Sequence, residues 1–132
     1  MLKFSPEGRV CSFCGTIGGP RSKFAGGYGA MICAECVDGY HEILHSDSRT
    51  REVQRPPWEA MTEEELVEKF AVIVRSAEQA DAFTHDWVKL MRLRGVSWAA
   101  IGKVLGITRQ GAWERFTRPR GPGRGDSSSA AS

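Results

Sequence analysis

The chain has 132 residues, of which 41% are hydrophobic and 26% charged, and this suits one ordinary domain or two very small ones. Its longest strongly apolar run, Phe70 to Val74, is far too short to span a bilayer, and no N-terminal stretch resembles a signal peptide. We therefore expect a soluble, cytoplasmic protein. In a reducing cytosol, four cysteines in two close pairs favour thiolate metal ligands over disulfides.

The net charge of +2 hides a strong segregation of charge along the chain. Residues 58–86 hold eight acidic residues against Lys69 and Arg75, whereas residues 89–124 hold a single acid, Glu114. The basic residues of the second segment are Lys89, Arg92, Arg94, Lys103, Arg109, Arg115, Arg118, Arg120 and Arg124. The C-terminal third would therefore attract a polyanion.

The cysteines form two C-x2-C pairs, Cys11 with Cys14 and Cys33 with Cys36, separated by eighteen residues. Two such pairs can close a tetrahedron around a zinc ion, with sulfurs about 2.3 Å from it. Four thiolates leave no open position for water or substrate, so the predicted Zn²⁺ is structural. A redox dithiol or a chance pair of motifs is the alternative.

The residues around the cysteines predict a small α+β module. Gly15 suits a knuckle turn after Cys14, the glycine-rich segment 26–29 fits a hairpin, and residues 35–44 would form a helix that carries Cys36. His41 and His45 lie four residues apart on that helix and could bind a metal together. We expect them to be solvated instead, because the cysteines already fill a tetrahedral shell.

The segments CSFCG at 11–15 and KFAGGYGAMICAECV at 23–37 resemble the N-terminal zinc-binding domain of the ClpX unfoldase. The resemblance implies a treble-clef-like fold, the four cysteines as ligands, dimerisation, and contact with adaptors or substrates. It places a dimer or partner face on Phe24, Ile32, Val37 and Ile43. The ATPase module of that family is absent, since the only Gly-Lys pair, Gly102-Lys103, lacks a phosphate-binding loop.

Helical signals begin at Thr62, which forms a predicted capping box with Glu65. Apolar residues then recur at helical spacing, and Ser76 with Gln79 repeats the capping signal, so one long helix or two are both open. The apolar positions are Leu66, Phe70, Ile73, Val74 and Ala77, then Ala80, Phe83, Trp87, Leu90 and Met91. A stop is expected near Arg94 and Gly95.

Residues 96–116 (VSWAAIGKVLGITRQGAWERF) resemble a helix-turn-helix of bacterial DNA-binding regulators. Ser97 would cap the first helix, Gly106 would make the turn, and Thr108 would cap the second. Small Gly102 would allow a close crossing. Residues expected to pack the two helices together are Ile101, Leu105, Ile107 and Ala112, with Phe116 also pointing inward.

The second helix would lie in the major groove of double-stranded DNA. Arg109 could pair with guanine and Gln110 with adenine, while Trp113 either faces the groove or packs on the first helix. The full set of candidate contacts is Thr108, Arg109, Gln110, Trp113, Glu114, Arg115 and Arg118, with Thr117 near a phosphate.

We therefore predict a small α+β zinc module (1–46, treble-clef-like), a linker (47–61), an all-α helix-turn-helix domain (62–117) and a disordered basic tail (118–132). The expected function is transcription regulation by a DNA-binding homodimer, whose zinc module joins subunits or recruits a partner protein. The alternative is a protease- or transcription-associated adaptor whose helical domain contacts protein. We predict no enzyme, and a nuclease using His41 or His45 beside the zinc is the remaining catalytic alternative.

Overall fold

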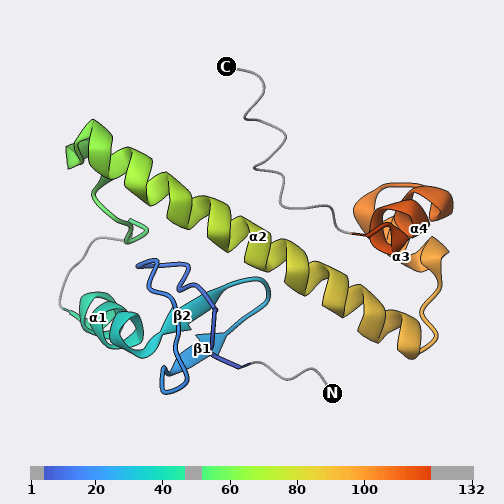
Figure 1. Ribbon diagram of the computed structural model, residues 1–132, viewed down its shortest axis with the longest axis horizontal. Coiled ribbons are helices and arrows are strands. Elements are labelled where there is room, and N and C mark those ends of the chain that lie inside the picture. Colours follow the sequence, from blue (N-terminus) through green and yellow to red (C-terminus); the bar gives the residue numbers. More distant parts are fainter. Residues whose placement is uncertain (1–4, 47–51, 120–132) are drawn as a thin grey trace. The chain divides into compact units, whose positions relative to one another are not determined.

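The computed structural model describes residues 5–46 and 52–119 (Figure 1). The chain divides into two compact units, Met1–Asp81 and Ala82–Ser132, and the division falls inside a helix. Residues 47–51 of the predicted linker and 120–132 of the predicted tail lie outside the described ranges. None of the helices in the described part combines the length and the apolar character that crossing a membrane requires.

The first unit contains a two-stranded antiparallel hairpin and a helix. Strand β1 (Phe24–Gly26) pairs with β2 (Met31–Cys33), with Phe24 opposite Cys33. Gly29 has a φ of 99°, which a side chain would disfavour, so the predicted glycine-rich hairpin is confirmed. Helix α1 (Ala34–His45) starts directly after β2, because Cys33 in extended conformation is its N-cap residue.

The described end of the linker, 52–61, has local structure of its own. A 3₁₀ turn, η1 (Trp58–Ala60), precedes the next helix, and the Arg55 guanidinium lies 4.3 Å from the Trp58 ring centroid. Arg55 also forms an ion pair with Glu59, and its hydrogen bonds hold the pKa of that exposed carboxyl at about 2. These contacts shape the chain just ahead of the helix.

Helix α2 (Glu63–Leu93) is continuous, which answers the question that the sequence left open. Its predicted capping box is confirmed. The Thr62 N–H donates to Glu65 at 2.8 Å, and the Glu65 N–H donates back to the Thr62 hydroxyl at 3.2 Å. Several large apolar side chains in its first turns are exposed: Leu66, Val67, Phe70 and Ile73.

Ser76 and Gln79 do not begin a second helix. Both lie inside α2, where the backbone N–H groups are already paired along the helix and no cap is needed. Their side chains instead reach residues of the cysteine module, at Ser12 and Val10. The prediction that Ser76 and Gln79 cap a helix is therefore wrong, although both residues do form hydrogen bonds through their side chains.

The second unit packs the end of α2 against α3 (Trp98–Leu105) and α4 (Arg109–Thr117). Its core is Val88, Ile101 and Ala112, with partly buried neighbours around them: Met91, Val96, Trp98 and Phe116. Inward positions for Ile101, Ala112 and Phe116 are confirmed.

Four helix ends in this unit use the residues that the sequence predicted. Gly95 ends α2 with a φ of 83° and Gly106 ends α3 with a φ of 69°. The Ser97 hydroxyl accepts the Ala100 N–H at 3.1 Å, and the Thr108 hydroxyl accepts the Gly111 N–H at 2.9 Å. A tight turn therefore joins α3 to α4.

The expected packing between α3 and α4 is only partly present. Leu105 and Ile107 remain 38% and 39% exposed, so Ile101 and Ala112 carry most of the buried contact. Gly102 supplies the close approach, because a Cβ there would lie 2.8 Å from the Ile107 carbonyl oxygen and 2.9 Å from that of Thr108. No side chain larger than hydrogen fits without moving the backbone.

Gly102→Ala should therefore destabilise the second unit by about 1–3 kcal/mol, the usual range for overpacking. Gly39→Ala is the matched control, since Gly39 lies inside α1 with open space where a Cβ would go. Alanine there should raise stability by about 0.5–1 kcal/mol through helix propensity. Denaturant unfolding of both variants measures the contrast, and equal effects of the two substitutions would contradict the close crossing at Gly102.

Candidate metal centre

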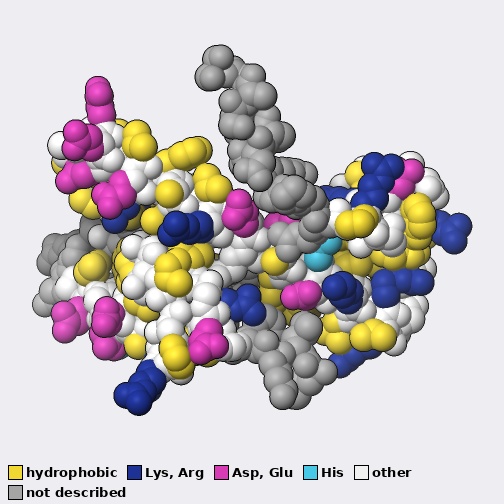
Figure 2. All heavy atoms as spheres, in the orientation of Figure 1, with side chains coloured by type: hydrophobic (Ala, Val, Ile, Leu, Met, Phe, Trp, Pro, Cys, Tyr) yellow, Lys and Arg dark blue, Asp and Glu magenta, His cyan; other side chains and the backbone are white. Residues whose placement is uncertain are grey.

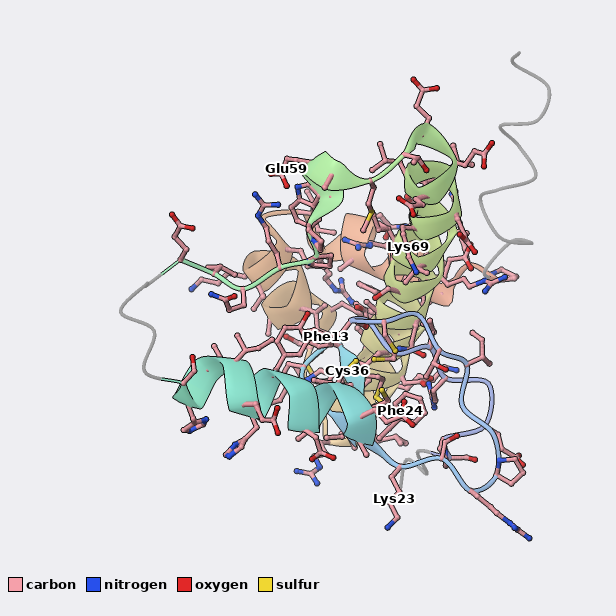
Figure 3. The ribbon with its side chains drawn as sticks, turned by 90° about the vertical axis from the view of Figure 1, so that its left-hand side faces the viewer. Phe13, Lys23, Phe24, Cys36, Glu59 and Lys69 are labelled. Carbon is pink, nitrogen blue, oxygen red and sulfur yellow. The ribbon has the colours of Figure 1, made fainter. Side chains whose placement is uncertain are left out.

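The four cysteines come from three elements of the first unit. Cys11 and Cys14 lie on the loop before the hairpin, Cys33 ends β2, and Cys36 lies in the first turn of α1. In Figure 3, Cys36 lies at the start of α1, close to Phe13 of the loop. The Phe13 ring packs edge-on against Tyr40 of α1, with centroids 5.4 Å apart. The loop and the helix therefore share an apolar contact beside the cysteines.

The sulfur atoms of the four cysteines lie within 4.8 Å of one another. The Cys11–Cys36 and Cys14–Cys33 sulfur pairs are separated by 3.9 and 3.7 Å. A tetrahedral ion with bonds of about 2.3 Å to sulfur requires sulfurs about 3.8 Å apart. The four thiols are free and not disulfides, and their spacing fits one bound metal ion.

Backbone hydrogen bonds shape the loop that carries the first two cysteines. The Cys11 N–H donates to the Thr16 carbonyl and the Gly15 N–H to the Cys11 carbonyl, both at 2.9 Å. Gly15 has a φ of 82°, so glycine is required at this turn. The Cys33 N–H donates to the Cys11 sulfur at 3.3 Å, which joins the loop to the hairpin through a ligand atom.

The four thiols differ in acidity. Burial opposes ionisation of Cys11, yet hydrogen bonds from the backbone of Cys14, Cys33 and Phe13 outweigh it and lower its pKa from 9.0 to about 6. Burial, together with the neighbouring cysteine side chains, raises the pKa of Cys36. Burial also raises the pKa of Cys14. Cys11 therefore ionises more readily than Cys14 and Cys36, which would have to lose their protons when an ion binds.

The four cysteines are partly shielded from solvent. Cys11 is fully buried and Cys33 nearly so, while Cys14 is exposed and Cys36 partly buried. Four thiolates would complete a tetrahedral shell, so a bound ion would have no position left for a substrate. A metal held here would supply structural cross-linking of the loop, β2 and α1.

No family model matches this chain, and no solved structure matches it either. The interpretation of the site therefore depends on its own geometry and on the chemistry of its residues.

His41 and His45 are outside the cysteine cluster, which is the sole group of potential ligands found in 5–46 and 52–119. Their rings lie 4.2 Å apart, and the Nδ1 atom of His45 lies 2.8 Å from the His41 carbonyl oxygen. That arrangement matches the expected solvated pair on α1.

The residues of the proposed dimer face are spread over the hairpin and α1. Val37 and Ile43 are exposed, at 42% and 46%. Phe24 and Ile32 are half-buried, and the Phe24 ring occupies the space beside Gly18. The available apolar surface is therefore mainly on α1.

The proposed DNA contacts lie on α4 and at its ends. Glu114 is half-buried, and the other side chains are exposed: Thr108, Arg109, Gln110, Trp113, Arg115 and Arg118. The Gln110 amide donates to the Glu114 carboxylate at 3.3 Å. Trp113 is 47% exposed, so its indole is neither fully packed nor fully free. Figure 2 shows Lys and Arg side chains gathered over α3 and α4, and acidic ones around the first turns of α2.

A set of contacts between α2 and the cysteine loop was not predicted from the sequence. Gln79 hydrogen-bonds to Val10, and Ser76 to Ser12, across more than sixty residues of chain in each case. The sequence does show two polar residues, Ser76 and Gln79, within an apolar helical pattern. That pattern does not indicate which distant residues they contact.

Metal binding should become stronger as pH rises from 6 to 8. The thiols of Cys14 and Cys36, with raised pKa values, are protonated at neutral pH and must release their protons to bind. Each ion bound should therefore release at least about two protons at pH 7, so the logarithm of the Zn²⁺ affinity should rise by about two per pH unit. Competition with a chromophoric chelator measures it, and an affinity independent of pH would contradict coordination by these thiols.

Proposed function

We propose that this protein is a DNA-binding transcriptional regulator with a structural zinc site. Four thiolates in a tetrahedron suit zinc, and the two sulfur pairs 3.7 and 3.9 Å apart support it. The order of loop, hairpin and helix around the cysteines is compatible with a treble-clef-like module, which the resemblance to the ClpX zinc domain implies.

The observation that carries the proposal is the geometry of α3, the turn and α4. Gly106 and Thr108 fix a tight turn, Gly102 allows close contact, and Ala112 of α4 is fully buried. Arg109 and Gln110 then stand exposed in the first turn of α4. A helix-turn-helix presents the first turn of its second helix to base edges in this way.

Charge supports the same reading. The second unit has basic residues on each of its helices, including Arg92, Lys103, Arg109 and Arg115, and Glu114 is the single acid on α3 and α4. Neutralising phosphates with such residues releases counterions and supplies affinity that does not depend on sequence. Arginine and glutamine at the start of α4 would add discrimination between bases.

The affinity for DNA should fall in each of the variants Arg109→Ala and Gln110→Ala. A bidentate contact to a base contributes about 1–3 kcal/mol, so each variant should bind its selected site roughly 5- to 150-fold more weakly. The site would be selected from random double-stranded DNA and the affinity measured by fluorescence anisotropy at several salt concentrations. Lys23→Ala is the control, because Lys23 is an exposed cation of the first unit.

Two results would reject the regulator. One is no binding to mixed-sequence DNA at low salt. The other is unchanged affinity in both α4 variants.

Pairing of two copies would place two α4 helices on one DNA site and raise affinity and specificity. The exposed Val37 and Ile43 on α1 are the candidate contacts, as the zinc-domain resemblance suggests. A charged side chain introduced at either position would have to be desolvated on pairing, and that desolvation costs more than the contact between the two copies returns.

Val37→Glu and Ile43→Glu should therefore convert a dimer to a monomer while helical content by circular dichroism stays the same. Light scattering gives the mass of each. Val53→Glu is the control, since Val53 is 84% exposed and lies outside α1. A wild-type chain that is monomeric at high concentration would contradict pairing through this face.

A protein adaptor is the second candidate, favoured by exposed apolar side chains in the first turns of α2, Leu66, Val67, Phe70 and Ile73, 45–73% exposed. Such a surface is more typical of protein contact than of DNA contact. The salt titration above separates the two functions, because an adaptor of this kind would show no salt-dependent DNA affinity.

A further inference from the structure

Three side chains on one face of α2 contact the loop that carries Cys11 and Cys14. They are Val72, Ser76 and Gln79, spaced by four and then three residues, so they share a face of the helix. All three lie within the first compact unit, together with the loop they touch. The part of α2 from Val72 to Gln79 is therefore packed on the loop that carries Cys11 and Cys14.

Gln79 makes the most specific of these contacts. Its Oε1 accepts the Val10 N–H at 2.9 Å, and its Nε2 donates to the Val10 carbonyl at 3.0 Å. One amide thus satisfies both backbone groups of a residue that is only 3% exposed. Val10 directly precedes the ligand Cys11, so this pair of bonds fixes the backbone next to the most buried sulfur.

Ser76 and Val72 extend the contact along the loop. The Ser76 hydroxyl donates to the Ser12 hydroxyl at 2.8 Å, and the Ser12 N–H donates to the Met31 carbonyl at 2.8 Å. A Cβ on Gly15 would lie 2.5 Å from Cγ2 of Val72, so the helix approaches as closely as glycine permits. The contact thus covers the loop from Val10 to Gly15.

We propose that Gln79 is a positioning residue of the metal centre, through which metal loading at the four cysteines and docking of α2 become linked. The inference rests on the proposed zinc site. A metal fixes the loop in the shape that presents the N–H and carbonyl of Val10 to Gln79. By reciprocity, a docked α2 favours the loop conformation that binds metal, and it raises metal affinity by the same factor.

The link extends the effect of the metal beyond the cysteine module. Without metal, the loop loses its cross-link to β2 and α1, and the amide of Gln79 loses its partner. The first half of α2 would then open more often.

The test is hydrogen exchange of the full chain with and without Zn²⁺, followed at the backbone amides of residues 72–81. In the wild type, Zn²⁺ should slow exchange there at least tenfold. In Gln79→Ala the slowing should be largely lost and the Zn²⁺ affinity should fall about tenfold. That factor corresponds to about 1.4 kcal/mol, or about 0.7 kcal/mol for each of the two lost hydrogen bonds. Gln79→Glu keeps the acceptor but not the donor, and should lie between the two.

Helix propensity cannot produce this result, because alanine is a better helix former than glutamine. Glu68→Ala, an exposed site on the same helix, should behave as the wild type. Ser76→Ala is the milder second variant, and it should show a partial loss if Gln79→Ala folds poorly.

The outcomes separate the inference from the proposed zinc site. If Zn²⁺ does not bind the wild type, the zinc site fails. If Zn²⁺ binds but exchange at residues 72–81 is unchanged, or Gln79→Ala matches the wild type in both exchange and affinity, the link through Gln79 is wrong while the zinc site stands.

Discussion

Four sulfur atoms that must meet at one point constrain the whole first unit. Few residues there are buried, and the apolar ones are Val10, Cys11 and Cys33. Such a core cannot offset the entropy of ordering the cysteine module, residues 5–46, so a cross-link through the four sulfurs would contribute much of its stability. The hairpin, the loop and the start of α1 each supply part of one tetrahedron. Their arrangement follows from that geometry more than from apolar packing.

Helix α2 is the element on which both units depend. Its first half offers Val72, Ser76 and Gln79 to the cysteine loop, and its second half offers Val88 and Met91 to α3 and α4. The second unit has a different source of order, an apolar core closed by capped helices and by Gly102. One unit is thus organised around four clustered thiols and hydrogen bonds to backbone, and the other around the burial of apolar side chains.

The sequence predicted well wherever cause and effect lie within a few residues. Thr62, Ser97 and Thr108 each cap the N–H three residues on, and Gly106 turns the chain at its own φ, so their roles can be read locally. The cysteine cluster was equally accessible, because two C-x2-C pairs have few other uses.

The roles of Ser76 and Gln79 could not be predicted from neighbouring residues. The residues they contact lie more than sixty positions earlier, and their type fits a cap as well as a docking contact. The exposure of Leu105 and Ile107 was missed for a related reason, since helical phase gives direction but not how much neighbouring chain arrives to cover it.

The four-thiolate site also changes the electrical balance of the molecule. The formal charge of +2 counts the cysteines as neutral; four thiolates lower it by four and a divalent ion raises it by two, which leaves a metal-loaded chain with no net charge. Attraction to a polyanion would then come from the separation of charge alone, as a dipole between acidic and basic segments. Near neutral pH, such a chain would have little overall repulsion to keep its copies apart.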